Sequence, residues 1–148
     1  MSQPQTYTKL TNLEVLNFAR DWYAALDRHD PIEEVLGYLD PDDLVLNFPE
    51  GTFHGIDGFR GWYDAVTHRF FDEAHRLDSV QVDLGTDPGR AQVAVNWQAR
   101  CWDPPAAAST WLGFDADQTW TVTAEGGRLR ILEYTVNDLK PMPGSGSL

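Results

Sequence analysis

The sequence contains very little cysteine and no long hydrophobic run. Cys101 is the only cysteine among 148 residues, so the chain cannot form an internal disulfide. This fits a reducing compartment, and a cytoplasmic location is expected. No segment approaches the roughly 18 apolar residues of a membrane span, and the polar start lacks the apolar centre of a secretion signal. We therefore expect no membrane partner.

Basic residues are scarce as well. The chain carries 11 Lys and Arg against 23 Asp and Glu, for a net charge of −12. Such a chain repels phosphate backbones, so nucleic acid is not an expected partner. Phosphate-binding loops, dinucleotide fingerprints, HExxH and paired CxxC motifs are absent from the sequence. Four scattered His and one Cys make a poor metal site, so neither a metal nor a cofactor is expected.

Hydrophobic residues make up 42% of the chain and include six Trp, which indicates a folded globular protein. Thr11 and Glu14 have the spacing of a capping box, and the apolar period that follows predicts a helix over residues 12–29. Asp30 before Pro31 predicts the cap of a short second helix that ends near Leu39. The helical period returns from residue 56 to residue 70.

Strand patterns occupy the rest of the chain. We expect strands over residues 44–48, in the alternating region after Glu73, and over residues 91–102, 109–123 and 129–137. The turn at 125–127 indicates that the last two form a hairpin. The order predicts an α+β fold in which a curved, mainly antiparallel sheet wraps around the N-terminal helices. The expected parts are an N-terminal extension (1–10), one domain (11–139) and a flexible tail (140–148).

Three stretches carry a family resemblance: WYAALDRHD (22–30), FHGIDGFRGWY (53–63) and GGRLRILEYTV (126–136). In this order and spacing they resemble the nuclear transport factor 2-like superfamily, over about residues 8–138. The resemblance implies a cone, in which a bent sheet encloses an apolar pocket, and a homodimer. Members of the superfamily include ketosteroid isomerases, polyketide-cyclase-like proteins, dehydratases, an epoxide hydrolase and non-enzymatic binding domains.

The ketosteroid isomerase chemistry does not carry over to this sequence. That enzyme, a standard example of pKa tuning, uses an Asp base with an oxyanion hole made of Tyr and a protonated Asp. The corresponding positions here hold Phe48, Trp22 and Thr119. Phe48 cannot accept a proton, so any catalysis must use other residues.

Strand alternation predicts which side chains line the pocket. Val93, Val95 and Trp97 alternate with polar residues, so they should face inward. In the next strand two interpretations stay open. Burial would turn Phe114 and Trp120 inward and leave Asp115 and Asp117 in solvent. The family hairpin implies the reverse, with Asp117 among aromatic rings and the apolar side forming a dimer surface.

Two classes of function remain open. The first is an acid–base enzyme acting on an apolar or polyketide-like ring compound, of the cyclase, isomerase or dehydratase type. In it Asp117 moves the proton, His54 assists, and Tyr134 and Asn47 hold an oxygen of the substrate. The second is a non-catalytic domain for binding a small apolar or aromatic ligand, or for dimerisation.

The expected ligand-contacting residues are Trp22, Asn47, Phe48, Trp62, Tyr63, Val95, Trp97 and Thr119. Glu50 is expected to be a solvated residue of a turn.

Overall fold

A computed structural model describes residues 11–83, 85 and 88–148. The helices are α1 (Asn12–Asp27), α2 (Ile32–Val35), the 3₁₀ helix η1 (Leu36–Tyr38) and α3 (Gly55–Arg69). The strands are β1 (Val45–Phe48), β2 (Gly51–His54), β3 (Phe70–Asp83), β4 (Gly89–Cys101), β5 (Thr110–Glu125) and β6 (Arg128–Pro141).

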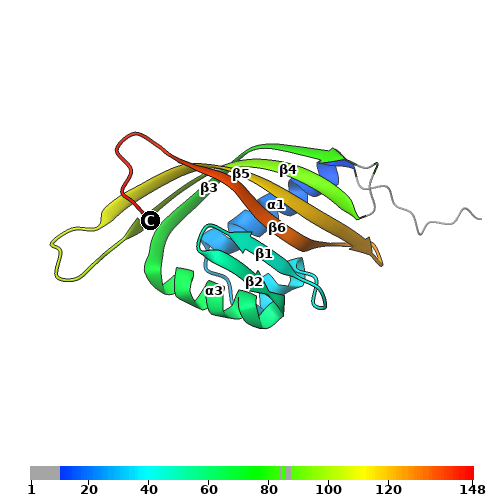
Figure 1. The fold of residues 1–148 in the computed structure, drawn as a ribbon, viewed down its shortest axis with the longest axis horizontal. Helices are drawn as coiled ribbons and strands as arrows, with labels where there is room; N and C mark the ends of the chain where they lie inside the picture. The colour runs from blue at the N-terminus through cyan, green and yellow to red at the C-terminus, as the bar shows by residue number, and fades with distance from the viewer. Residues whose placement is uncertain (1–10, 84, 86–87) are drawn as a thin grey trace, which may run out of the picture.

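The six strands form one mixed sheet in the order β2-β1-β6-β5-β4-β3. β1 runs parallel to β6, and the other neighbouring pairs are antiparallel. The four long strands curve over α1, while α3 and the β1–β2 hairpin lie below them (Figure 1). The predicted α+β class and the mainly antiparallel sheet are confirmed, and the sheet stays open at both edges.

The predicted first helix begins where its capping box placed it. The Thr11 side chain accepts a hydrogen bond from the Glu14 backbone at 3.1 Å. One face of α1 then packs against the sheet and buries Val15, Ala19 and Trp22. In the part of the chain that the structure describes, no helix is long and apolar enough to cross a membrane.

The predicted start of the second helix is wrong by one residue. Pro31 occupies the cap position instead of the first helical position, and the helix tightens into η1 after Val35. The Asp30 carboxylate does not cap the helix, because it forms an ion pair with Arg28 at 2.7 Å.

The segment after β1 forms a strand that the alternation did not predict. β2 pairs with β1 from Val45↔His54 to Phe48↔Gly51, so Pro49 and Glu50 form the turn of a hairpin. Gly51 adopts a φ of 148°, a conformation that a side chain would oppose. This hairpin carries the chain from the sheet to the start of α3 and positions Phe48 at one wall of the interior.

The orientation of β5 decides between the two sequence interpretations. Leu112, Phe114 and Trp120 are buried on the inner face of the sheet, while Asp115 and Asp117 are exposed. The expectation that Asp117 faces the interior is therefore wrong. The apolar side chains that were expected to form a dimer surface lie in the core, where truncating a buried Trp costs about 3–5 kcal/mol. A homodimer stays a prediction, without that surface to support it.

The C-terminal segment follows β5. β6 continues to Pro141, four residues past the predicted end of the strand. Beyond it, the Met142 amide donates to the Gly113 carbonyl at 2.9 Å and the Gly146 amide donates to the Trp111 carbonyl at 3.0 Å. The expected flexibility of residues 140–148 stays a prediction, and the predicted extension at 1–10 lies outside the described residues.

Candidate active site

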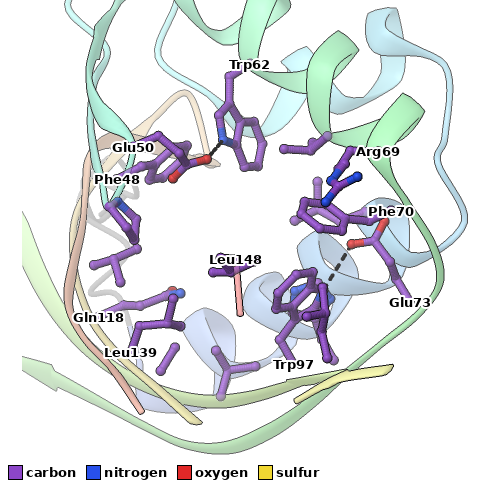
Figure 2. Close-up of a pocket in the computed structure, with 18 of the residues that line it drawn as sticks. Phe48, Glu50, Trp62, Arg69, Phe70, Glu73, Trp97, Gln118, Leu139 and Leu148 are labelled. Carbon is purple, nitrogen blue, oxygen red and sulfur yellow. Dashed lines mark hydrogen bonds between the residues drawn. The ribbon is translucent and has the colours of Figure 1, made fainter. Parts of the chain in front are cut away.

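A cavity of about 520 Å³ lies between the inner face of the sheet, α1 and α3 (Figure 2). This volume falls within the roughly 300–1,000 Å³ typical of small-molecule sites. Aromatic and aliphatic side chains make up most of its wall. The polar or charged side chains around it include Glu50, Arg69, Glu73, His75 and Gln118.

Most of the expected ligand-contacting residues surround this cavity. Its wall includes Trp22, Phe48, Trp62, Tyr63, Val95, Trp97 and Tyr134. Phe48 packs against the Trp62 ring, with 4.6 Å between centroids, and lies edge-on to Tyr134. At the turn between β1 and β2, Trp62 Nε1 donates to the carboxylate of the exposed Glu50 at 3.1 Å. Contact of these residues with a ligand stays a prediction.

Other predicted site residues lie outside the cavity. Asp117 pairs with Asp138 of β6 on the exposed face of the sheet, because its neighbours Ala116 and Gln118 take the inward positions. His54 is the exposed cap residue of α3, and its side chain makes no capping bond. The proton-transfer roles predicted for Asp117 and His54 therefore have no support from the geometry.

Asn47 and Thr119 also point away from the cavity. Asn47 Nδ2 donates to Thr135 Oγ1 at 3.0 Å, in a register that pairs Leu46 with the inward Tyr134. Thr119 bonds to Gln92 at 2.5 Å on the same outer face. Each lies one residue from an inward neighbour, and strand alternation excludes it from the cavity.

A carboxylate–imidazole pair joins α1 to β3 at the cavity wall. Asp27, the last residue of α1, accepts the backbone N–H of His75 on Oδ2 at 2.9 Å. Its Oδ1 lies 2.5 Å from His75 Nδ1. Two bonds from one carboxylate fix both the backbone and the ring of His75.

The second imidazole nitrogen of His75 is available for chemistry. The ring lines the cavity and stacks on Tyr23, with 4.6 Å between centroids. None of the hydrogen bonds between described residues uses Nε2. When Nδ1–H donates to Asp27, Nε2 of the neutral ring holds a lone pair and can accept a proton. The Asp27 carboxylate then stabilises the imidazolium that results.

A group of buried hydroxyl and amide side chains faces the same cavity. Tyr23 Oη donates to Gln118 Oε1 at 2.6 Å and lies 3.3 Å from Tyr134 Oη. Trp120 Nε1 donates to the same Gln118 oxygen at 3.2 Å. Burial raises the pKa of Tyr23 and of Tyr134, so both hydroxyls stay neutral donors at ordinary pH.

Two further donors in this group have no protein acceptor. Trp22 Nε1 is buried and has no hydrogen-bond partner among the described residues. Among the described residues, Gln118 is hydrogen-bonded through its oxygen only, and its amide nitrogen has no partner. A ligand oxygen beside Trp22 and the Gln118 amide would satisfy both donors, and for the buried Trp22 N–H it would remove a cost of about 1–3 kcal/mol.

A second carboxylate, Glu73, lines the cavity two residues before His75. Trp97 Nε1 donates to Glu73 Oε1 at 3.0 Å, and His29 Nε2 contacts Glu73 Oε2; Figure 2 shows the bond from Trp97.

The pKa of Tyr63 is raised to about 12, mainly by desolvation and partly by the charges of Asp30 and Glu73. The Tyr63 hydroxyl donates to the Asp30 carbonyl at 2.7 Å. No group of three metal-ligating side chains occurs within residues 11–83, 85 and 88–148.

Sequence reasoning missed Asp27, Glu73, His75 and Gln118. One available signal was the alternation in FDEAHRL (71–77), where Glu73, His75 and Leu77 share a strand face. The other was the parity of β5, which places Gln118 between the inward Ala116 and Trp120. The partner of His75 had no local signal, because Asp27 is 48 residues away.

Comparison with known proteins places this architecture in a family. A proposed aromatic ring hydroxylase from Novosphingobium aromaticivorans matches with a TM-score of 0.76 at 16% identity, covering 88% of this chain and 92% of that one. A proposed scytalone dehydratase from the same organism matches with a TM-score of 0.64 at 14% identity, covering 90% and 87%. A hexachlorocyclohexane dehydrochlorinase from Novosphingobium barchaimii gives 0.70 at 14%, covering 90% and 91%. At these identities the likeness shows the fold alone.

None of the curated proteins compared with this chain matches it. The model of the SnoaL-like domain family matches residues 10–135, which is most of the chain. The resemblance that the sequence carried in its three stretches is thereby confirmed. The chain belongs to the SnoaL-like domain family of the nuclear transport factor 2-like superfamily.

Proposed function

We propose that this protein is a cofactor-free acid–base enzyme that removes a proton from carbon in a small apolar ring compound. His75 Nε2 is the base, and Asp27 orients and stabilises it. The reaction is of the dehydratase or isomerase type, in which a carbanion-like transition state next to a carbonyl group leads to a new double bond. Asp117 and His54, the groups expected from the sequence, have no part in it.

The Asp27–His75 pair is the observation that carries the proposal. A base needs a lone pair aimed at the substrate and a partner that stabilises its protonated form. The two bonds from Asp27 meet the second need and leave Nε2 free for the first. Only 11% of the His75 side chain is exposed, so bulk water competes little for that nitrogen.

The donors on the opposite wall supply the second requirement of the chemistry. Removing a proton beside a carbonyl places negative charge on the carbonyl oxygen, and fixed donors lower the barrier by stabilising it. Trp22 Nε1 and the Gln118 amide nitrogen offer such donors at the cavity surface. Because burial raises the pKa values of Tyr134 and Tyr23, both hydroxyls keep their protons, and the bond from Tyr23 to the Gln118 oxygen holds the Gln118 amide in place for this role.

The wall of the cavity supports a particular class of substrate. Trp22, Phe48 and Trp62 present ring faces and edges to the interior, which favours a flat, largely apolar compound. The structural relatives named a dehydratase and a dehydrochlorinase act, by their names, through elimination, and this chain shares their fold. Elimination begins with loss of a proton from carbon, so the proposed chemistry is compatible with both.

A non-catalytic binding domain is the competing class. A cavity built only for binding would be lined almost wholly by apolar groups. A catalytic cavity needs a buried acid or base in contact with a polar partner. The partly buried His75 and its bonds to Asp27 satisfy the second condition, which is why we favour an enzyme.

Exchange of carbon-bound protons with solvent tests the proposal without knowledge of the natural substrate. The protein is incubated in D₂O with a phenyl-substituted cyclohexanone, and NMR follows loss of the α-proton signals. His75→Gln should slow the exchange by about 10²–10⁴-fold, the usual contribution of a general base. Asp117→Asn, which removes a carboxylate from the outer face, is the control and should exchange at the rate of the unmodified protein.

Two results would contradict the proposal. Equal exchange by His75→Gln and the unmodified protein would remove His75 from the chemistry. A protein that binds phenyl-substituted cyclohexanones tightly, as measured by quenching of Trp fluorescence, but exchanges none of their protons would favour the binding domain.

A further inference from the structure

A second imidazole–carboxylate pair reaches the cavity, and the proposed base does not use it. Glu73 lines the cavity with its carboxylate between two donors. Trp97 Nε1 occupies one oxygen at 3.0 Å, and His29 Nε2 contacts the other. The Glu73 side chain is only 9% exposed, whereas the His29 side chain is 28% exposed. The pair therefore has one group at the cavity and one that reaches toward solvent.

Both partners depend on unusual backbone at this point. β3 has a register shift between Phe71 and Ala74, and Asp72 within it adopts a φ of 50°. A bulge of this kind changes which residues face the interior, and here Phe70 and Glu73 both line the cavity. Without the irregularity, strict alternation would turn Phe70 and Glu73 to opposite faces.

His29 stands at a helix-end position that favours glycine. The Asp30 amide donates to the Ala25 carbonyl and the His29 amide donates to the Leu26 carbonyl, the bonding pattern that ends many helices. The residue in this place adopts a left-handed conformation, and His29 has a φ of 52°. For an L-residue that conformation costs about 1–2 kcal/mol. Strain retained beside a cavity points to a role for the side chain.

We propose that Glu73, protonated through His29, is a second acid–base group that delivers a proton to the leaving group of the substrate. This inference rests on the proposed function, because it needs His75 to remove the first proton. The substrate class becomes narrower: ring compounds whose leaving group is a hydroxyl, which must gain a proton to depart as water.

The step balances as an elimination of water. The C–H bond breaks, its proton moves to His75 Nε2, and its electron pair forms the carbon–carbon double bond. The C–O bond breaks, and its pair stays on oxygen, which takes the proton of the Glu73–His29 pair. His29 then gains a proton from solvent and His75 releases one, so the products are an unsaturated ring and water.

Several charged or titratable groups surround the pair. On α3, the Tyr63 hydroxyl is bonded to the Asp30 carbonyl, and Arg69 is paired with Asp103. On β3 itself, His75 is held by Asp27. Each of these is already bonded to a partner other than Glu73. His29 is thus the side chain positioned to supply a proton to that carboxylate.

The test compares two leaving groups on one ring. The probes are a phenyl-substituted cyclohexanone with a β-hydroxyl and its β-chloro analogue, and enone formation is followed by absorbance. Chloride leaves without a proton. Glu73→Gln should therefore slow loss of water by about 10²–10⁴-fold, the range for a general acid, and slow loss of chloride by less than about threefold. His75→Gln should slow both reactions.

His29 acts through Glu73 and is tested by replacement and rescue. His29→Gly and His29→Asn keep residue types that accept the left-handed backbone, so both variants should fold. Both should lose turnover of the hydroxyl probe selectively. Added imidazole should restore part of the lost rate in His29→Gly, which a merely structural role of His29 would not allow.

The outcomes are distinguishable. Equal losses on both probes in Glu73→Gln would assign Glu73 a structural role and overturn the inference, as would no loss on either. If α-proton exchange persists in Glu73→Gln while loss of water stops, the inference is supported separately from the base. If the unmodified protein exchanges no α-proton, the proposed function fails and the inference fails with it.

Discussion

Two carboxylate–imidazole pairs connect the end of α1 to β3. The helix end and the strand exchange roles between the two pairs, because each supplies the carboxylate in one and the imidazole in the other. In the first pair, the helix supplies the carboxylate of Asp27 and the strand supplies the imidazole of His75. In the second, His29 just beyond the helix supplies the imidazole and the strand supplies the carboxylate of Glu73. The first pair therefore presents an imidazole to the cavity and the second a carboxylate, and each is bonded to a partner outside the cavity wall.

Because the two pairs present different groups to the cavity, we expect them to play different roles in proton transfer. A cavity with two identical pairs would hold two equal bases. Here His75 presents a nitrogen lone pair, while Glu73 presents a carboxyl that its partner can reprotonate. In the proposed chemistry, β3 thus supplies a proton acceptor and a proton donor two residues apart. The predictions below break one pair or the other.

The largest effect is expected from Asp27→Asn. The amide can still occupy the place of the carboxylate, but it cannot stabilise a charged imidazole. Loss of the carboxylate that orients and stabilises a catalytic imidazole costs up to about 10⁴-fold in turnover, and we expect a loss of about 10²–10⁴-fold. The measurement is the rate of α-proton exchange across the pH range. A variant with full activity and an unchanged pH profile would show that Asp27 is only structural.

A smaller effect is expected from the tyrosines beside the two pairs. Tyr23 stacks on His75, and burial raises its pKa above the ordinary 10.0. The pKa of Tyr63, on which the charge of Glu73 acts, is raised to about 12. Each tyrosine stabilises the fold fully below pH 10. This contribution is lost as the pH rises through the folded-state pKa, because above 10 the unfolded chain ionises first.

Denaturant unfolding between about pH 9 and pH 12 measures this loss. The free energy of unfolding should fall with pH, and Tyr23→Phe should remove up to about 1.4 kcal/mol per pH unit from the slope. Tyr63→Phe should also flatten the slope, because the pKa of Tyr63 is raised to about 12. An unchanged slope in Tyr23→Phe would mean that the phenol is not held neutral beside His75.

Most of the fold could be predicted from the sequence, because its signals are local. The capping box at Thr11, the helical period after residue 56 and the double glycine at 126–127 each specify a boundary within a few residues. β2 gave no such signal, since its four residues are held by pairing with β1 and not by alternation of their own. The predicted start of the second helix was wrong by one residue, because proline is accepted both at the cap and at the first helical position.

The candidate site could be predicted only in part, because it depends on contacts between distant segments. Helix faces and strand parity placed Trp22, Val95 and Trp97 around the cavity. For Asp117, the sequence left open both the burial pattern and the reverse orientation implied by the family, and the structure has the orientation that burial predicts. The two pairs arise where a helix end meets a bulged strand, and neither the bulge nor the left-handed His29 follows from residue type.

The smallest expected effect is on stability, and it comes from His29→Gly. Glycine relieves the left-handed backbone, a gain of about 1 kcal/mol, but removes the contact with Glu73. The two terms oppose each other, so we expect the free energy of unfolding to change by less than about 1 kcal/mol. Asp72→Gly is the matched control, because Asp72 has a similar φ of 50° and is exposed. It should be the more stable variant, since it gains the relief without losing the pair. If His29→Gly gained as much stability as Asp72→Gly, the His29–Glu73 contact would contribute nothing to the fold, and its retention against strain would have to come from function alone.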